Sequence, residues 1–227
     1  MKHGKKYMES LKKYDPSKVY DVSEACKIVK DIHYAKFDET VELSVTLSLE
    51  KNQTVRDTLV FPHQFTAEKR VLVFCKEERV KEALDAGATY AGSTEYLDKV
   101  KGGWLDFDVA VATPDMMKDV GRLGMVLGRK GLMPNPKTGT VTPNIAEAVA
   151  ELKKGRTEFR ADKTGVVHIP VGKVSMDAKD TAENVATFLS ELSRKKPQDA
   201  KAGFVRSVSI SSSMGPGVWV DFKEDAE

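Results

Sequence analysis

Apolar and polar residues alternate without a break from residue 40 to residue 49. The apolar positions are Val41, Leu43, Val45, Leu47 and Leu49. A period of two places them all on one face, so this segment is predicted to be a strand with one buried face. A similar alternation runs from 55 to 61, after turn-forming residues at 51–53. The two segments are predicted to pair as an antiparallel hairpin.

The middle of the chain has a different pattern. Residues 71–75 and 109–112 are short apolar runs without alternation, which is typical of strands covered on both faces in a parallel sheet. Between them, apolar residues at helical spacing predict helices over 78–86 and about 95–100. Strand, helix, helix and strand in this order indicate an α/β layer domain.

The last third of the chain returns to alternating strands and amphipathic helices. A helix is predicted over 145–154, with Asn144 as N-cap and Glu147 completing a capping-box-like pair. Strands over 158–162 and 166–171 flank a predicted tight turn. The remaining predictions are a helix over about 180–195 and strands over 204–211 and 218–222. In the first third, a short helix is predicted from Ser23 to Ile32.

These patterns predict a mixed fold, with α+β ends and an α/β middle. Short polar segments that could connect two domains lie near residues 66–70 and 155–157. We therefore expect two domains. One is a discontinuous α+β domain built from both chain ends, residues 1–67 and 157–227, and the other is an α/β domain inserted at residues 68–156.

The composition is that of a folded protein. The chain has 227 residues, 36 Lys and Arg against 34 Asp and Glu, and a formal net charge of +2. It has no apolar run of about 18 residues and no apolar segment behind its basic N-terminus that would mark a secretory signal. Cys26 and Cys75 match no C-x-x-C motif and are expected to be reduced thiols in a cytoplasmic protein. The net charge near zero argues against a nucleic-acid partner until the charges are resolved by position.

Sequence motifs of enzymes are mostly absent. There is no H-E-x-x-H, no G-x-S-x-G and no metal-ligand spacing of Cys and His, so we predict no catalytic residue, metal site or cofactor. The segment from Gly131 to Thr138 resembles a phosphate loop, but Pro136 lacks the N–H that would bind a phosphate. The main alternative function is a two-domain α/β enzyme with an interdomain cleft, which would need titratable residues that converge there.

Basic residues gather in three segments of the chain. Residues 1–18 hold six lysines, residues 120–146 hold four basic residues and no acidic one, and residues 153–163 hold five basic residues. For residues 1–18, a solvated tail and a polyanion-binding arm are about equally favoured. For residues 120–146, a structured loop with solvated charges and contact with an RNA backbone are about equally favoured.

Hydroxyl side chains line the polar faces of two predicted strands. They are Thr40, Ser44, Thr46 and Ser48 on one strand, and Ser207, Ser209, Ser211 and Ser213 on the other. Hydroxyls both donate and accept hydrogen bonds, which matches the 2′-OH and phosphate groups of RNA. Thr and Ser are also common on exposed strands of any protein, so the pattern taken alone favours ordinary exposed strands. Beside the basic segments and the glycine-rich turn at residues 214–217, it shifts the interpretation toward RNA without deciding for it.

Four motifs in a fixed order are more specific. They are Lys36-Phe37-Asp38-Glu39-Thr40-Val41-Glu42, Gly131-Leu132-Met133-Pro134-Asn135-Pro136-Lys137, Asp162-Lys163-Thr164-Gly165 with His168, and Ser213-Met214-Gly215-Pro216. With these motifs the chain resembles the bacterial large-subunit ribosomal protein L-one family over nearly its whole length.

The resemblance implies a domain formed by both chain ends and an inserted three-layer α/β (Rossmann-like) domain. It implies a structural constituent of the large ribosomal subunit that binds 23S-type rRNA at the mobile stalk beside the tRNA exit site. Family members assist the movement and release of deacylated tRNA, and bacterial members repress translation of their own operon mRNA. The expected partners are therefore large-subunit rRNA, exit-site tRNA and the operon mRNA. The free protein is expected to be a cytoplasmic, ribosome-associated monomer without a membrane partner.

The family's RNA-binding residues carry over to matching positions of this chain. They are Lys36, Phe37, Thr40, Glu42, Lys163, Thr164, His168, Ser211, Ser213, Met214 and Gly215. Arg129, Lys130 and Lys137 are expected to make accessory RNA contacts from the inserted domain. Two positions depart from the family pattern: Ser213 replaces a usual threonine, and Gly128-Arg129-Lys130-Gly131 replaces Gly-Pro-Arg-Gly, which adds a charge.

Overall fold

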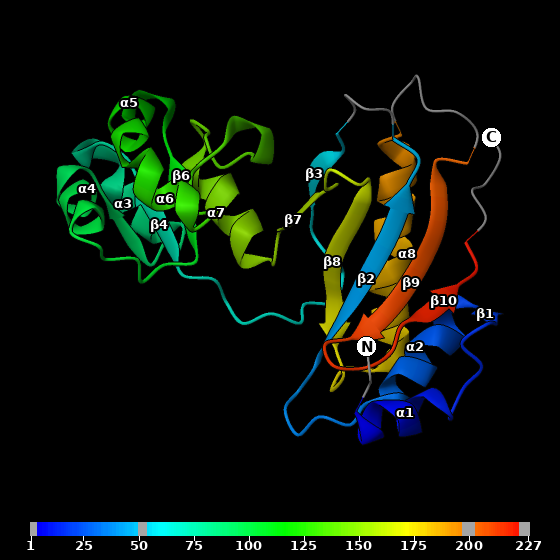
Figure 1. The fold of residues 1–227 in the computed structure, drawn as a ribbon. Coiled ribbons are helices and arrows are strands. Elements are labelled where there is room, and N and C mark those ends of the chain that lie inside the picture. Colours follow the sequence, from blue (N-terminus) through cyan, green and yellow to red (C-terminus); the bar gives the residue numbers. More distant parts are fainter. Residues whose placement is uncertain (1–3, 50–53, 197–202, 223–227) are drawn as a thin grey trace. The chain divides into compact units, whose positions relative to one another are not determined.

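The computed structural model describes residues 4–49, 54–196 and 203–222 (Figure 1). Contacts divide the chain into two compact units. The terminal unit combines Met1–Phe65 with Glu158–Glu227, and the inserted unit is Thr66–Thr157. Each unit has hydrophobic clusters of its own.

A five-stranded sheet forms the centre of the terminal unit, in the order β1-β10-β9-β2-β8. The central strand β2 (Thr40–Leu47) pairs antiparallel with β8 (Val166–Lys173) and with β9 (Val205–Ser212). Beyond β9, β10 (Val218–Val220) pairs antiparallel with it, and β1 (Val19–Tyr20) pairs parallel with β10. The sheet therefore joins strands from both ends of the chain.

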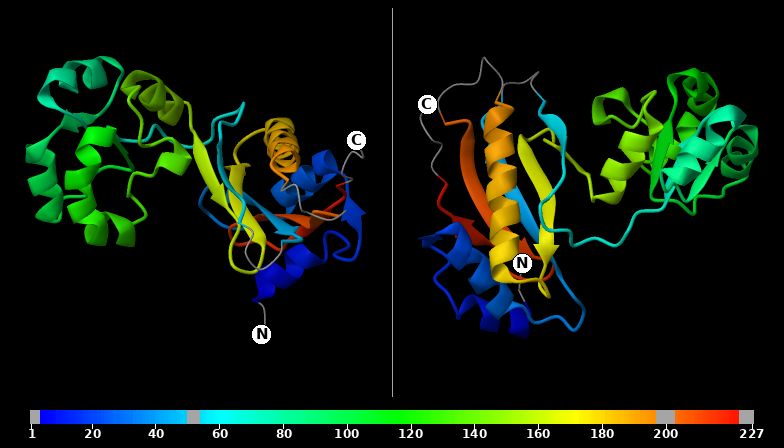
Figure 2. Two further views of the ribbon diagram at one scale, coloured as in Figure 1. Left: turned by 90° about the horizontal axis from the view of Figure 1, so that it is seen from above. Right: turned by 180° about the vertical axis from the view of Figure 1, so that it is seen from behind.

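Two helices, α2 (Val22–Ile32) and α8 (Ala178–Arg194), cover one face of this sheet (Figure 2). Alternate residues of β2 are buried against them, and the residues between are exposed or partly exposed. The predicted alternation of β2 is thus confirmed. Inside the unit, the fully buried Asn184 of α8 donates hydrogen bonds of 2.9 Å from Nδ2 to the carbonyls of His63 and Val171, which ties α8 to the sheet.

The predicted hairpin of residues 40–49 and 55–61 is wrong. β3 (Arg56–Leu59) pairs with β7 (Thr157–Arg160) in a separate two-stranded sheet. Both edges of β2 are occupied along its whole length by β8 and β9, which come from more than a hundred residues away. These long ladders leave no edge of β2 to the short β3 strand. The predicted turn at 51–53 lies outside the described residues.

The N-terminal segment is folded where the structure describes it. Residues Lys5–Leu11 form helix α1. Ser10 is buried, and its Oγ donates a hydrogen bond of 2.8 Å to the carbonyl of Ile32 at the end of α2. The interpretation as a solvated tail is therefore wrong for the described part of this stretch, from residue 4 onward, although Lys5 and Lys6 remain exposed.

Helix α7 (Ile145–Lys153) confirms the predicted helix but not its capping box. The side chain of Asn144 makes no hydrogen bond to the backbone of the first turn. Instead, its Nδ2 donates to Glu147 Oε2 at 3.2 Å, so the two side chains satisfy each other. The residue types of a capping box are present here without its backbone contacts.

The inserted unit contains a parallel sheet in the order β5-β4-β6, as the apolar runs predicted. All four side chains of β4 are buried. One hydrophobic cluster joins the sheet to α3 and α7, and a second joins it to α4, α5 and α6. The bounds are β4 (Val71–Phe74), β5 (Tyr90–Gly92), β6 (Val109–Ala112), α3 (Val80–Asp85), α4 (Thr94–Lys101), α5 (Met117–Val120) and α6 (Gly124–Arg129). No helix in the described ranges is long and apolar enough to cross a membrane.

Candidate nucleic-acid interface

The face of the five-stranded sheet opposite α2 and α8 carries the polar side chains. We call it the open face and define it by Thr40, Glu42, Ser44, Thr46, His168, Ser207, Ser209, Ser211 and Trp219, all exposed or partly exposed. One row crosses all five strands in register: Val19, Trp219, Ser209, Ser44 and His168. Side chains in register lie about 5 Å apart, so this row presents a continuous line that is apolar at Val19 and Trp219 and polar from Ser209 to His168.

The hydroxyl groups of β2 and β9 lie opposite one another on the open face. Ser44 pairs with Ser209, and Thr46 pairs with Ser207. On the β8 side, Ser44 Oγ lies 3.0 Å from Nδ1 of His168, within hydrogen-bonding distance. This contact fixes the orientation of the exposed imidazole, whose other nitrogen is directed away from Ser44.

The loop before β2 and the turn after β9 meet at one end of the open face. Ser213 Oγ accepts from Thr40 N at 3.2 Å and donates to Thr40 O at 3.3 Å. Tyr34 Oη donates to the carbonyl of Met214 at 2.6 Å. Met214 and Phe37 keep large exposed apolar side chains beside these contacts. We call residues 34–40 and 212–217 together the paired loops.

A buried carboxylate holds the paired loops together. Glu39 is fully buried, and its Oε1 and Oε2 accept hydrogen bonds of 3.0 Å from the N–H groups of Ala35 and Met214. Burial opposes ionisation, but a side-chain interaction with Ser212 and the backbone N–H groups outweigh it and lower the pKa of Glu39. The Ser212 hydroxyl is itself buried and falls short of full hydrogen-bond geometry. Glu39 is thus an ionised group that positions both loops.

Lys163 and Thr164 lie at the other end of the sheet, in the turn between β7 and β8. Asp162 accepts from the hydroxyl and N–H of Thr164 and from the N–H of Val166, and these bonds lower the pKa of its carboxyl. Gly165 has φ of 82°, as the turn prediction required. The Thr164 hydroxyl is therefore directed at Asp162, and Lys163 is exposed.

The structure groups most of the predicted RNA-binding residues. Eight lie at the end of the open face with the paired loops: Lys36, Phe37, Thr40, Glu42, Ser211, Ser213, Met214 and Gly215. His168 lies midway along the face. Lys163 and Thr164 lie at the opposite end of the face. The two ends are about 20 Å apart, because six residues of β2 separate them and each residue of a strand spans about 3.3 Å. A surface of this length fits several nucleotides.

The accessory residues belong to the inserted unit. Arg129 ends α6 and Lys130 follows it, and both side chains are exposed. They border a shallow, largely apolar depression beside Met125, which is 85% exposed. The side chain of Lys137 lies outside the described part of the structure. Within that part, no three His, Cys, Asp or Glu side chains cluster as metal ligands.

Sequence reasoning missed three residues of this region. Glu39 and Tyr34 position the paired loops, and Trp219 lies exposed on the open face. Glu39 stands inside the motif from Lys36 to Glu42, but no periodicity separates a buried carboxylate there from an exposed one. The exposure of Trp219 could have been predicted from the sequence. Its neighbours Val218 and Val220 are buried, and the alternation of a strand places Trp219 on the opposite face.

Comparison with known proteins gives consistent matches over the full chain. The model of the ribosomal protein L1p/L10e family matches residues 29–216. The chain is 71% identical over 223 residues to large ribosomal subunit protein uL1 of Treponema denticola, covering 98% of this chain and 99% of that protein. The uL1 proteins of Treponema pallidum and Borrelia hermsii are 66% and 55% identical, over 99% and 97% of this chain and 100% and 99% of theirs.

Proposed function

Since this chain belongs to the ribosomal protein L1p/L10e family, we propose that it binds the mobile-stalk segment of large-subunit rRNA with the open face and the paired loops. Membership of the family makes it an RNA-binding, non-enzymatic protein of the large ribosomal subunit. The site, the RNA segment and the actions described below are parts of the proposal.

The paired loops carry this proposal furthest. They present Phe37 and Met214 as exposed apolar groups, Lys36 as a cation, and hydroxyls on adjacent strands. RNA is recognised by its shape, its 2′-hydroxyls and its unpaired bases, and these groups can contact all three. Because Glu39 and Ser213 fix the loops before RNA arrives, binding orders few side chains and keeps its entropy cost low.

Glu42 fits this interface despite its negative charge. It is exposed on the open face, directly opposite Ser211 in the register of β2 and β9. A carboxylate accepts hydrogen bonds from a 2′-OH or from a guanine amino group. We assign Glu42 to such a contact rather than to a phosphate.

In this proposal the two compact units act as two domains. The RNA-binding domain corresponds to residues 1–67 and 157–227, and the inserted three-layer α/β domain, which is Rossmann-like, corresponds to residues 68–156. Helices against both faces of its parallel sheet support the three layers. Arg129 and Lys130, exposed on that domain, add accessory phosphate contacts.

The stalk position gives the protein its further roles. From the stalk, we propose that the protein assists the movement and release of deacylated tRNA from the exit site. An operon mRNA that folds into a stalk-like element is proposed to bind the same open face, and the protein would then repress translation of that mRNA. If so, the mRNA element and the rRNA fragment compete for binding, and one substitution weakens both to the same extent.

Substitution of two interface residues tests the site. We expect Met214→Ala and Ser211→Ala each to weaken binding of a stalk rRNA fragment by about fivefold, because each loses one contact worth about 1 kcal/mol. The measurement is a filter-binding titration. Thr187→Ala is the control, since its hydroxyl bonds only to its own helix, on α8 behind the sheet. Unchanged affinity in both folded interface variants would contradict the site.

A further inference from the structure

We propose that Trp219 is a stacking platform for an unpaired RNA base, and that the pocket beside it holds that base. This inference rests on the proposed function and extends the interface from the paired loops toward the β1 edge of the sheet. It adds a residue that the family motifs above do not contain.

Trp219 is a large aromatic side chain left 46% exposed on the open face. It lies in register with Ser209, and through it with Ser44 and His168. The indole thus continues the same row that carries the hydroxyls of the proposed interface. Val19, in register on its other side, is 53% exposed and closes the row.

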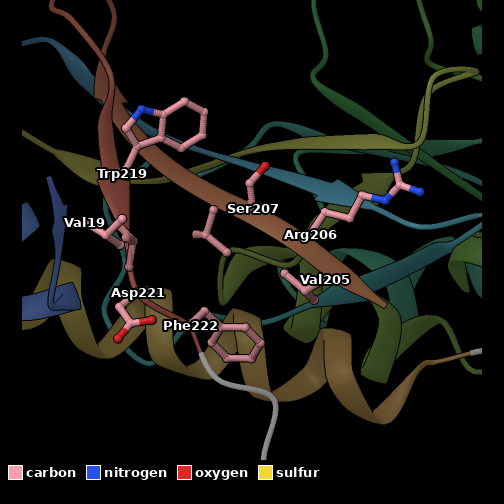
Figure 3. Close-up of a pocket in the computed structure, with 9 residues that line it drawn as sticks. Val19, Val205, Arg206, Ser207, Trp219, Asp221 and Phe222 are labelled. Carbon is pink, nitrogen blue, oxygen red and sulfur yellow. The ribbon is translucent and has the colours of Figure 1, made fainter. Parts of the chain in front are cut away.

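The pocket arises from the different lengths of β9 and β10. β10 ends at Val220, opposite Val208, whereas β9 already begins at Val205. After β10 the chain turns toward β1, where Asp221 N donates to Tyr20 O at 2.8 Å. The pocket left beside the end of β10 has a volume of about 250 Å³, with Trp219 on one side and Asp221 and Phe222 on the other (Figure 3).

The chemistry of the lining favours a base over a phosphate. Trp219, Val19 and Phe222 offer apolar and aromatic surface, while Ser207 offers a hydroxyl. The Asp221 carboxylate repels a phosphate but accepts a hydrogen bond from a base amino group. Arg206 also lines the pocket, but it is exposed and directs its guanidinium to within 3.4 Å of Ser48 Oγ, just after the end of β2. The cation therefore lies on the hydroxyl side, where the RNA backbone would run.

Continuity with the open face identifies the partner as RNA. An exposed tryptophan binds many apolar partners, but this one is aligned with hydroxyls on two strands and flanked by a cation. Aromatic side chains on a sheet face are a general platform for single-stranded bases. A base needs one ring face and one polar edge, and the pocket supplies both.

Fluorescence and affinity together test the proposal. In a Trp104→Phe background Trp219 is the sole tryptophan of the chain, so its emission reports the pocket. We expect a stalk rRNA fragment with unpaired bases to quench it, and a fully paired duplex of equal length to leave it unchanged. Trp219→Ala is expected to weaken binding of the fragment by about tenfold, and Trp219→Phe by about twofold, because phenylalanine still stacks.

The outcomes separate this inference from the proposed function. If the parent chain binds the fragment but shows no quenching, and Trp219→Ala binds as well as the parent, the stacking assignment is overturned and the interface at the paired loops stands. If the parent does not bind the fragment at all, the proposed function itself fails. Equal weakening by Trp219→Phe and Trp219→Ala would assign the effect to packing of the sheet edge and also overturn the proposal.

Discussion

We expect Glu39→Gln to lower the free energy of unfolding by about 3 kcal/mol, since leaving a buried polar group unsatisfied costs about 1–3 kcal/mol. Both carboxylate oxygens accept backbone N–H groups, from Ala35 and from Met214. Glutamine keeps one acceptor oxygen and turns an NH₂ group toward the other donor, so one bond is lost and two donors face each other. Because the same bonds position the paired loops, RNA affinity falls as well.

Urea unfolding followed by circular dichroism measures the stability loss. Asp38→Asn is the matched control, because Asp38 is the preceding residue and its carboxylate bonds to Ser175 while exposed. We expect this variant to lose less than about 1 kcal/mol, as exposed groups find water instead. Equal losses in the two variants would contradict the role of Glu39.

The pH dependence has a definite sign. The folded state lowers the pKa of Glu39 below its ordinary value of 4.5, so the unfolded chain takes up this proton first as the pH falls. The stabilisation is therefore complete above pH 4.5 and is lost as the pH falls through the folded-state pKa. The stability difference between the parent and Glu39→Gln should shrink over that range.

We expect Gly215→Ala to weaken RNA binding by about tenfold, which equals about 1.4 kcal/mol. A Cβ atom at position 215 would overlap the hydroxyl of Ser212. Ser212 is only 3% exposed, so its side chain has little room to rotate away. The turn that carries Met214 must shift instead, and such overpacking costs about 1–3 kcal/mol.

Gly217→Ala is the control for this substitution. Gly217 lies two residues further along the same loop, its added Cβ would meet nothing within 4 Å, and its φ is not positive. Titration of the rRNA fragment should show near-parental affinity for Gly217→Ala. If both alanine variants bind alike, the close approach at Gly215 has no bearing on recognition.

Local sequence patterns predicted much of the fold. The alternation of β2, the apolar runs of β4 and β6 and the stripe of α8 each follow from the face that a residue buries. The pairing of the strands could not be predicted in this way. The partners of β2 are β8 and β9, which lie far along the chain, and no local sequence pattern favours them over the nearby β3. The capping-box prediction failed because the residue types only allow the backbone contacts of that motif. In the structure the side chains of Asn144 and Glu147 bond to each other instead.

The candidate site could also be predicted only in part, because local patterns are visible in the sequence and long-range contacts are not. Exposed hydroxyls on alternating strands are visible in the sequence, and the ordered motifs locate the paired loops. The contacts that hold these loops are long-range, such as the bond from Met214 to Glu39. Whether a glutamate before a strand is buried depends on the segment folded over it, so sequence alone assigned Glu39 no role.

The salt dependence of RNA binding tests the central claim, that hydroxyl and backbone contacts recognise the RNA more than bulk charge does. The interface brings few cations to the RNA: Lys36, Lys163 and Arg206 are exposed on the terminal unit, with Glu42 among them, and Arg129 and Lys130 of the inserted unit add two more. Titrating the stalk rRNA fragment over a range of salt, we expect a log–log slope between about −2 and −4.5, since each neutralised phosphate contributes about −0.7 to −0.9. A slope near −9, equivalent to about ten phosphates, would contradict the account.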